Sequence, residues 1–131
     1  MSKLAILCVD DESIILNSLI RQLQSAFDDQ YLYETAENAE EALEIIEELQ
    51  EEQSQLLVIV SDWLMPGAKG DEFLIQVHEQ FPGVIKIMLT GQADPQAVQR
   101  AEADANLHAC LNKPWNETEL ISMIKSAIES L

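Results

Sequence analysis

Residues 56–67 read LLVIVSDWLMPG: five apolar residues in a row, then Ser61 and Asp62, then a loop signalled by Pro66-Gly67. A continuous apolar run of this length, rich in β-branched residues, is typical of a strand that is buried on both faces. Such strands occur in parallel sheets that helices cover on both sides, so the stretch predicts an α/β fold. Asp62 is then expected at the carboxyl end of a central strand.

The segments on either side of this stretch alternate between strand patterns and helix patterns. Besides the central strand, we expect strands over residues 4–10, 31–36, 84–89 and 108–112. We expect helices to open at polar residues that suit a helix start, namely Ser13, Asn38, Asp71, Asp94 and Asn116. Five strands alternating with five helices predict a doubly wound parallel sheet. A length of 131 residues predicts one domain over residues 1–131.

Composition excludes several classes of protein. There are 24 acidic and seven basic residues, and the net charge of −17 argues against direct binding of nucleic acid. No apolar run approaches the roughly 18 residues of a membrane span, and the first residues do not resemble a signal peptide. Cys8 and Cys110 are expected on strands that are not neighbours, so no disulfide is predicted. The default expectation is a cytoplasmic protein.

Polar residues stand at the predicted ends of several strands: Asp10 and Asp11, Asp62, Thr90 and Lys113. Because the carboxyl ends of parallel strands lie at one edge of a sheet, these side chains are expected to meet there. Three carboxylates so close repel one another unless a cation compensates them, and oxygen ligands suit Mg²⁺, with Mn²⁺ as a substitute. We expect Asp11 and Asp62 to bind the ion directly and Asp10 to act through water.

The same edge has the groups needed for transfer of a phosphoryl group to a carboxylate. The backbone carbonyl of Trp63 is a further candidate ligand for the ion. Lys113 can reach one phosphoryl oxygen, the Thr90 hydroxyl can donate to another, and Gly91 leaves room beside them. Taken alone, each residue has a commoner structural interpretation: a helix-capping turn for Asp10-Asp11, a strand residue for Thr90, an ion-pair partner for Lys113. Their joint order along alternating strands and helices favours the site.

The sequence resembles the receiver domains of two-component signalling. The resemblance rests on four pieces: Val9-Asp10-Asp11-Glu12, Ser61-Asp62-Trp63-Leu64-Met65-Pro66-Gly67, Met88-Leu89-Thr90-Gly91 and Lys113-Pro114. It implies a flavodoxin-like sheet with strand order 2-1-3-4-5 and a cis peptide bond before Pro114. It also implies a phosphoacceptor switch rather than an enzyme. In such a switch Asp62 receives a phosphoryl group from a histidine kinase or histidine phosphotransfer protein, and an output domain or effector protein responds.

Three positions depart from the family or adjust its behaviour. The family usually has an aromatic switch residue where this chain has Cys110, so signalling is expected to pass through Thr90 and the fourth helix alone. Leu64 and Gln92 occupy the two positions that tune dephosphorylation in the family, and an apolar Leu64 predicts slow loss of the phosphoryl group.

Cys110 leaves one alternative open, a pseudo-receiver that binds partners without phosphorylation. A phosphatase with an aspartate nucleophile is disfavoured, because that class needs an acid at the position of Leu64. The stretches around Thr90 and Lys113 are also weakly similar to receivers fused to cyclic-dinucleotide phosphodiesterase, phosphatase or kinase modules.

Overall fold

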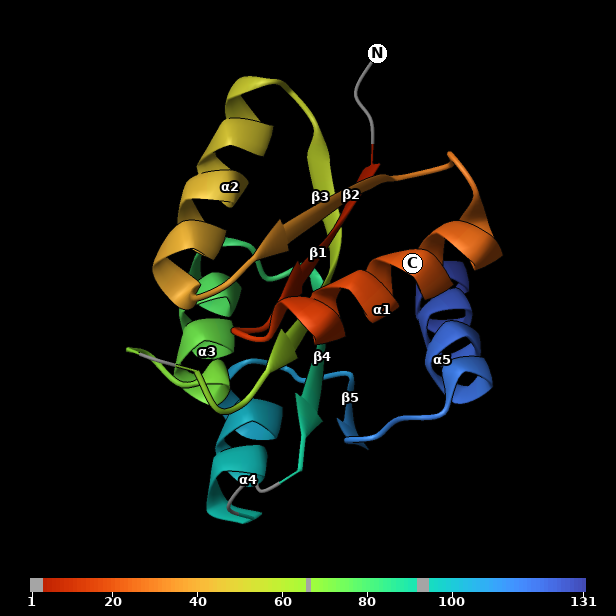
Figure 1. Ribbon diagram of the computed structural model, residues 1–131. Helices are drawn as coiled ribbons and strands as arrows, with labels where there is room; N and C mark the ends of the chain where they lie inside the picture. Colours follow the sequence, from red (N-terminus) through yellow and green to blue (C-terminus); the bar gives the residue numbers. More distant parts are fainter. Residues whose placement is uncertain (1–3, 66, 92–94) are drawn as a thin grey trace.

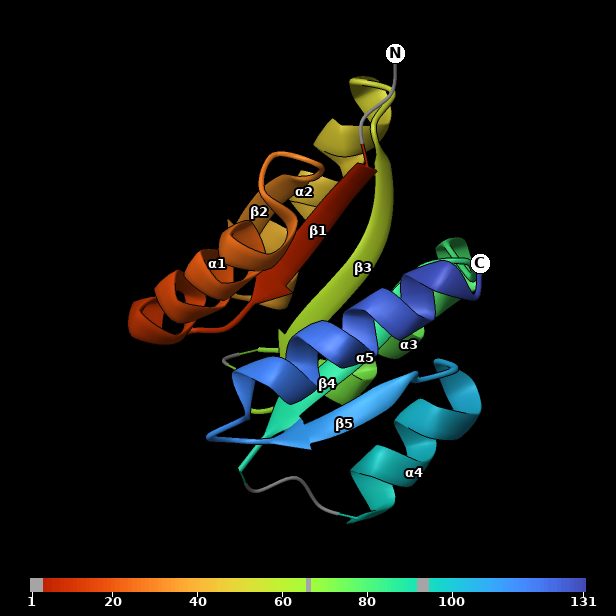
Figure 2. The ribbon, with the colours of Figure 1, turned by 90° about the vertical axis from the view of Figure 1, so that its right-hand side faces the viewer.

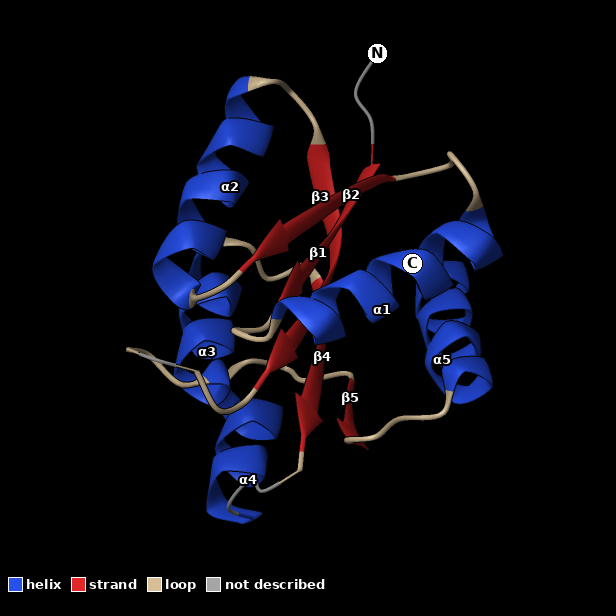
Figure 3. Ribbon diagram, in the orientation of Figure 1, coloured by secondary structure: helices blue, strands red, loops and turns tan. Residues whose placement is uncertain are grey.

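The computed structural model describes residues 4–65, 67–91 and 95–131, and within them five strands alternate with five helices. Figure 1 follows them along the chain, and Figure 3 separates them by type. The strands are β1 (Leu4–Val9), β2 (Leu32–Ala36), β3 (Gln55–Asp62), β4 (Ile85–Thr90) and β5 (Ala109–Asn112). The helices are α1 (Ser13–Phe27), α2 (Ala39–Glu51), α3 (Gly70–Gln80), α4 (Pro95–Asp104) and α5 (Glu117–Glu129).

The strands form one parallel sheet in the order β2-β1-β3-β4-β5. Figure 2 shows this order across the sheet, from β2 at one edge to β5 at the other. The order reverses between β1 and β3, because the chain first moves outwards to β2 and then returns past β1. This confirms the predicted flavodoxin-like, doubly wound fold, in which the reversal point lies at the carboxyl ends of β1 and β3.

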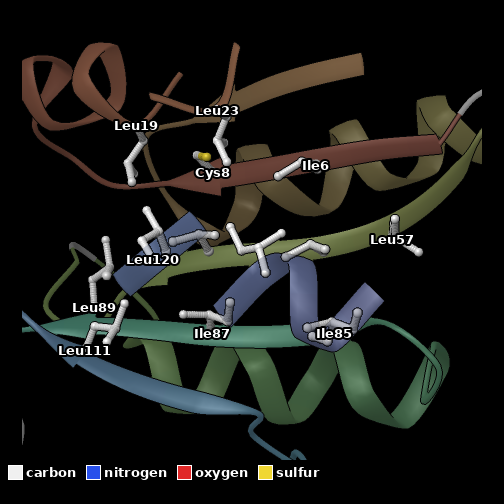
Figure 4. Packing of buried hydrophobic residues seen from close by; sticks show 14 of the residues in the cluster. Ile6, Cys8, Leu19, Leu23, Leu57, Ile85, Ile87, Leu89, Leu111 and Leu120 are labelled. Carbon is white, nitrogen blue, oxygen red and sulfur yellow. The ribbon is translucent and has the colours of Figure 1, made fainter. Parts of the chain in front are cut away.

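Helices cover both faces of the sheet. α1 and α5 lie on one face, and α2, α3 and α4 lie on the other (Figures 1 and 2). Val58, Ile59 and Val60 of β3 are fully buried, with Val58 and Val60 in the core under α1 and α5 and Ile59 in the core under α2 to α4. The apolar run is therefore continuous because successive side chains enter opposite cores. Figure 4 shows the first of these cores, between the sheet and helices α1 and α5.

Two of the predicted helix caps are confirmed. The Asn38 side chain accepts a hydrogen bond from the backbone N–H of Glu41, and Asn116 accepts one from Glu119 in the same way. The predicted cap at Ser13 is wrong, because Ser13 is already the first helical residue and the Glu12 side chain before it makes no capping hydrogen bond. Asp94, the cap predicted for α4, lies outside the described residues.

Strand ends differ from the predictions by one residue at several places. β1 ends at Val9, although the Asp10 backbone N–H still donates to the Ala36 carbonyl at 3.0 Å. β2 and β5 begin one residue later than predicted, β4 runs from Ile85 to Thr90, and β3 includes Ser61 and Asp62. Both cysteines lie in the described part of the chain and are free thiols, as predicted. No helix in residues 4–65, 67–91 and 95–131 is long and apolar enough to cross a membrane.

Candidate functional site

Three strands bring ionisable side chains together at the carboxyl edge of the sheet. Asp10 and Asp11 follow β1, Asp62 is the last residue of β3, and Lys113 follows β5. One carboxylate oxygen from each aspartate lies within 4.8 Å of the others. We call Asp10, Asp11, Asp62 and Lys113 the acid pocket. The structure thus assembles the four charged residues that the strand pattern placed at one edge.

Lys113 joins two of the carboxylates. Its Nζ donates to Asp10 Oδ2 at 2.7 Å and lies 3.0 Å from Asp62 Oδ1. The other Asp10 oxygen, Oδ1, accepts the backbone N–H of Glu12 at 2.9 Å. Asp10 is fully buried and has protein partners on both oxygens, whereas Asp11 is exposed. Asp10 therefore suits the outer role expected for it, and Asp11 is the more accessible carboxylate.

Charge in the acid pocket is only partly balanced, since three carboxylates and one ammonium leave a formal charge of −2. Burial raises the pKa of Asp62, and the charges of Asp10 and Asp11 add to this rise, which the contact with Lys113 opposes without reversing. Burial by itself would lower the pKa of Lys113, but its hydrogen bonds to Asp10 and Asp62, together with their charges, raise it. The ammonium is therefore held protonated, and a divalent cation bound by oxygen atoms, such as Mg²⁺, would neutralise the remaining charge.

The Trp63 backbone is fixed on two sides next to Asp62. Its N–H donates to the Leu89 carbonyl at 3.0 Å, and its carbonyl accepts the Gly70 N–H at 2.7 Å. A carbonyl oxygen has two lone pairs, so this one can still serve a metal ion. A Cβ at Gly70 would clash with the Asp62 carbonyl oxygen and would lie 2.8 Å from Trp63 Cα. Gly70 therefore permits the close approach of α3 to the end of β3, a role that the sequence analysis missed.

Thr90 and Lys113 come from neighbouring strands. Thr90 is buried at the end of β4, and its backbone carbonyl accepts the Lys113 N–H at 3.0 Å. The peptide bond between Lys113 and Pro114 is cis, as the resemblance implies. A Cβ at Gly91 would have Lys113 atoms at 4.0 Å as its nearest neighbours, so there is open space beside Thr90.

Cys110 lies half-buried on β5, on the sheet face covered by α2 to α4, and the next residue, Leu111, enters the opposite core. Beside it is a hollow of about 410 Å³ whose lining includes Thr90, Pro95 and Val98 as well as Cys110. Burial raises the pKa of the Cys110 thiol, and the charge of Glu102 adds to the rise. The thiol is therefore a weak nucleophile. Its small side chain also leaves the hollow next to Thr90 unfilled.

The two positions predicted to tune dephosphorylation differ in what can be described. Leu64 is two residues after Asp62, and its side chain is 53% exposed. Gln92 lies outside the described residues. An apolar side chain is therefore presented to solvent near the acid pocket at the first of these positions.

Asp71 contacts the loop after Asp62, and Arg100 on α4 contacts Asp71. The sequence pattern predicts only a helix start at Asp71 and no role for Arg100. Asp71 is buried, and its carboxylate accepts hydrogen bonds from Trp63 Nε1 and from Arg100. The signal for Asp71 was its spacing, since helical periodicity places it on the same face as Leu74, a core residue. No pattern in the sequence pairs it with Arg100 on a different helix.

Comparisons with known proteins agree on one family. The sequence model of the response regulator receiver domain matches residues 6–125. The hydrogenase transcriptional regulatory protein HoxA of Cupriavidus necator is 31% identical over 125 residues, which are 95% of this chain and 24% of HoxA. This chain spans 15–24% of the length of the curated relatives that it matches.

Two solved structures show the same architecture. A CheY-like response regulator receiver domain protein from Methanospirillum hungatei is 31% identical, with a TM-score of 0.83 and coverage of 99% of this chain and 96% of that chain. The beryllofluoride-activated NtrC4 receiver domain dimer is 30% identical, with a TM-score of 0.81 and coverage of 96% of this chain and 97% of that chain.

Proposed function

The chain belongs to the response regulator receiver domain family, and from this premise we propose that it is a phosphorelay switch in which Asp62 accepts a phosphoryl group with the help of Mg²⁺. One observation carries the proposal: an ammonium group, Lys113 Nζ, spans Asp10 and Asp62 within a cluster of three carboxylates. A purely structural ion pair needs one partner of each sign. Here the negative charge exceeds the positive, as a site for a divalent cation and an incoming phosphoryl group requires.

The proposed reaction transfers phosphorus from a donor imidazole to Asp62. A carboxylate oxygen of Asp62 forms a bond to phosphorus while the bond between phosphorus and the imidazole nitrogen breaks, and the nitrogen keeps the electron pair. Lys113 is anchored by its contact with Asp10 and turns from Asp62 towards a phosphoryl oxygen. The Thr90 hydroxyl donates to another phosphoryl oxygen.

Asp11, Asp62 and the Trp63 carbonyl are the proposed ligands of the ion, with Asp10 acting through water. When bound, Mg²⁺ would neutralise charge on the carboxylates and on the phosphoryl oxygens. Mn²⁺ offers the same oxygen chemistry and is the proposed substitute.

Partners follow from the family and from the relatives. The proposed donor is a histidine kinase or histidine phosphotransfer protein. HoxA is a transcriptional regulatory protein about four times as long as the matched segment, so we propose that this receiver likewise controls an output domain or effector protein. The proposed output surface includes Thr90 and α4.

Intact mass spectrometry after incubation with acetyl phosphate and Mg²⁺ tests the proposal. We expect one added phosphoryl group on the wild type, none on Asp62→Asn, and an unchanged adduct on Asp29→Asn, which removes an exposed aspartate remote in sequence from the acid pocket. Chelation of Mg²⁺ with EDTA should prevent the reaction. An adduct on Asp62→Asn would show that another residue is the acceptor.

Fluorescence of Trp63 separates the switch from the alternative of a pseudo-receiver. Trp63 lies next to Asp62, so Mg²⁺ and acetyl phosphate should change its fluorescence in a Trp115→Phe background that leaves Trp63 as the one tryptophan. A wild type with no adduct and no fluorescence response to either reagent would support a binding module that is not controlled by phosphorylation.

A further inference from the structure

Three side chains, with the buried carboxylate of Asp71 at their centre, connect the loop after Asp62 with α4. Asp71 Oδ1 accepts a hydrogen bond from Trp63 Nε1 at 2.9 Å, and Asp71 Oδ2 accepts one from Arg100 Nη1 at 3.0 Å. The three residues belong to the loop after β3, to the first turn of α3 and to α4. We call Trp63, Asp71 and Arg100 the Asp71 link.

The two contacts that Asp71 makes in this link differ in exposure. The Asp71 side chain is 1% exposed, and its hydrogen bond to the indole is buried. The Arg100 side chain is 50% exposed. Water can solvate the half-exposed guanidinium when it leaves Asp71, so opening this contact costs less than breaking the buried hydrogen bond to the indole. The inner half of the link is therefore the fixed part, and the contact with α4 is the part that can open.

The indole end of the link is connected to the acid pocket through the backbone of Trp63. Trp63 directly follows Asp62, and its N–H is bonded to Leu89, the residue before Thr90. Lys69 Nζ lies 5.0 Å from the centre of the indole ring, a cation–π contact from the same loop. Contacts at both its backbone and its indole therefore hold Trp63, the residue whose carbonyl is a proposed ligand.

The α4 end of the link acts on a helix with a small apolar contact area. The buried side chains of α4 are alanines, Ala97 and Ala101, and Ala105 follows it. Alanine buries little apolar surface compared with leucine or phenylalanine. Since α4 packs against α3, the ion pair between Arg100 and Asp71 adds a polar contact between these two helices to that small apolar area.

We propose that Asp71 and Arg100 are positioning residues that couple the acid pocket to α4. Asp71 holds the Trp63 indole, and with it the backbone next to Asp62, while Arg100 transmits that position to α4. The proposal rests on the function proposed above, and it gives this chain a connection from the pocket to α4 that does not need an aromatic side chain at Cys110. By thermodynamic linkage, breaking the Arg100 contact must then alter both the response of α4 and the affinity of the pocket for its ion.

The test compares Arg100→Gln with Arg21→Gln, a control that removes one exposed positive charge on α1. The Kd of Mg²⁺ is measured by Trp63 fluorescence in the Trp115→Phe background. We expect Arg100→Gln to raise the Kd by about threefold or more relative to Arg21→Gln. The Kd of Arg100→Lys should lie between these two values, and closer to that of the wild type than to that of Arg100→Gln. Electrostatics alone predicts the opposite sign, because losing a positive charge near the pocket favours cation binding.

The second measurement is amide hydrogen exchange of Pro95–Asp104 with Mg²⁺ alone and with Mg²⁺ plus beryllofluoride, a phosphoryl mimic. We expect beryllofluoride to change exchange in the wild type and in Arg21→Gln, and this change to shrink in Arg100→Gln. Trp63→Phe breaks the other end of the link while keeping an aromatic ring. We expect a similar rise in the Kd of Mg²⁺, measured by calorimetry because this variant lacks the fluorescent indole. This variant also serves if Arg100→Gln does not fold.

Two results would overturn the coupling. The first is a Kd in Arg100→Gln equal to or below that of Arg21→Gln. The second is a raised Kd with an unchanged response of α4 to beryllofluoride, since the link would then hold the loop without affecting the helix. Failure of the proposed function is distinguishable, because the wild type itself would then bind no Mg²⁺ and form no adduct.

Discussion

Leu64 is the residue at which the lifetime of a phosphoryl group on Asp62 can be tested. Its apolar side chain is 53% exposed beside the acid pocket and can neither donate nor accept a hydrogen bond from an attacking water. We predict that Leu64→Asn shortens the lifetime by about threefold or more, because an amide can orient that water. Intact mass measured over time after removal of acetyl phosphate, at constant Mg²⁺, gives the rate. Leu64→Met is the apolar control and should retain the slow loss; equal or slower loss in Leu64→Asn would contradict the prediction.

Lys86 is a second residue whose environment allows a prediction, here about the stability of the fold. Its side chain is 1% exposed on β4, and Nζ donates to the Val84 carbonyl at 2.6 Å. Among the described residues no carboxylate forms an ion pair with it. Burial accordingly lowers its pKa. We predict that Lys86→Met raises the free energy of unfolding by about 1 kcal/mol or more at pH 7, because an apolar side chain of similar length replaces a buried charge without a counter-ion.

The pH dependence of this gain tests its cause. Since burial lowers the folded-state pKa of Lys86 below its ordinary value of 10.5, the unfolded chain takes up the proton first as the pH falls. The wild type therefore loses stability as the pH falls from about 10.5 to the folded-state pKa, and the penalty is constant below that. The advantage of Lys86→Met in urea unfolding should shrink as the pH rises towards 10.5. An advantage that stays constant or grows with pH would rule out desolvation of the ammonium as its origin.

At the scale of single elements, the starts of α1 and α2 make a matched pair. Asn38 Oδ1 accepts the Glu41 N–H at 2.8 Å, so Asn38→Ala should lower the free energy of unfolding by about 1 kcal/mol. Ser13 is the first residue of α1 and not its cap, so Ser13→Ala should change stability by less than about 0.5 kcal/mol. Urea unfolding of both variants measures the difference. A cost for Ser13→Ala as large as that for Asn38→Ala would mean that Ser13 does cap α1.

These elements also show how much of the fold could be predicted from the sequence. The run in β3 and the cap at Asn38 are local features, and local patterns predicted them. Ser13 misled because Asp10, held in the acid pocket, accepts the Glu12 N–H just before α1, and that contact depends on packing. The close approach at Gly70 and the pairing of Asp71 with Arg100 depend on how α3 and α4 meet the end of β3, which no periodicity encodes. Strand order likewise came from the family motifs, because apolar runs are alike at every position of a parallel sheet.

At the scale of the whole molecule, the net charge of −17 affects stability throughout the fold. Self-repulsion of this size destabilises the compact state, and salt weakens it by screening. NaCl should therefore stabilise the wild type and every variant of unchanged fold. The acid pocket adds a local term, because three carboxylates share one ammonium and burial raises the pKa of Asp62. A monovalent salt screens this repulsion only weakly, since the groups are less than one Debye length apart.

Mg²⁺ and NaCl at matched ionic strength should therefore differ in their effect. Binding to the folded state adds stability of about 2.7 kcal/mol when free Mg²⁺ is 100 times its Kd, beyond general screening. We predict that thermal unfolding shows this additional stabilisation in the wild type and in Asp29→Asn. Asp11→Asn should lose most of it, because it removes the exposed carboxylate proposed to bind the ion. Equal stabilisation by the two salts in the wild type would mean that Mg²⁺ acts only on the overall negative surface, and that the acid pocket is not its binding site.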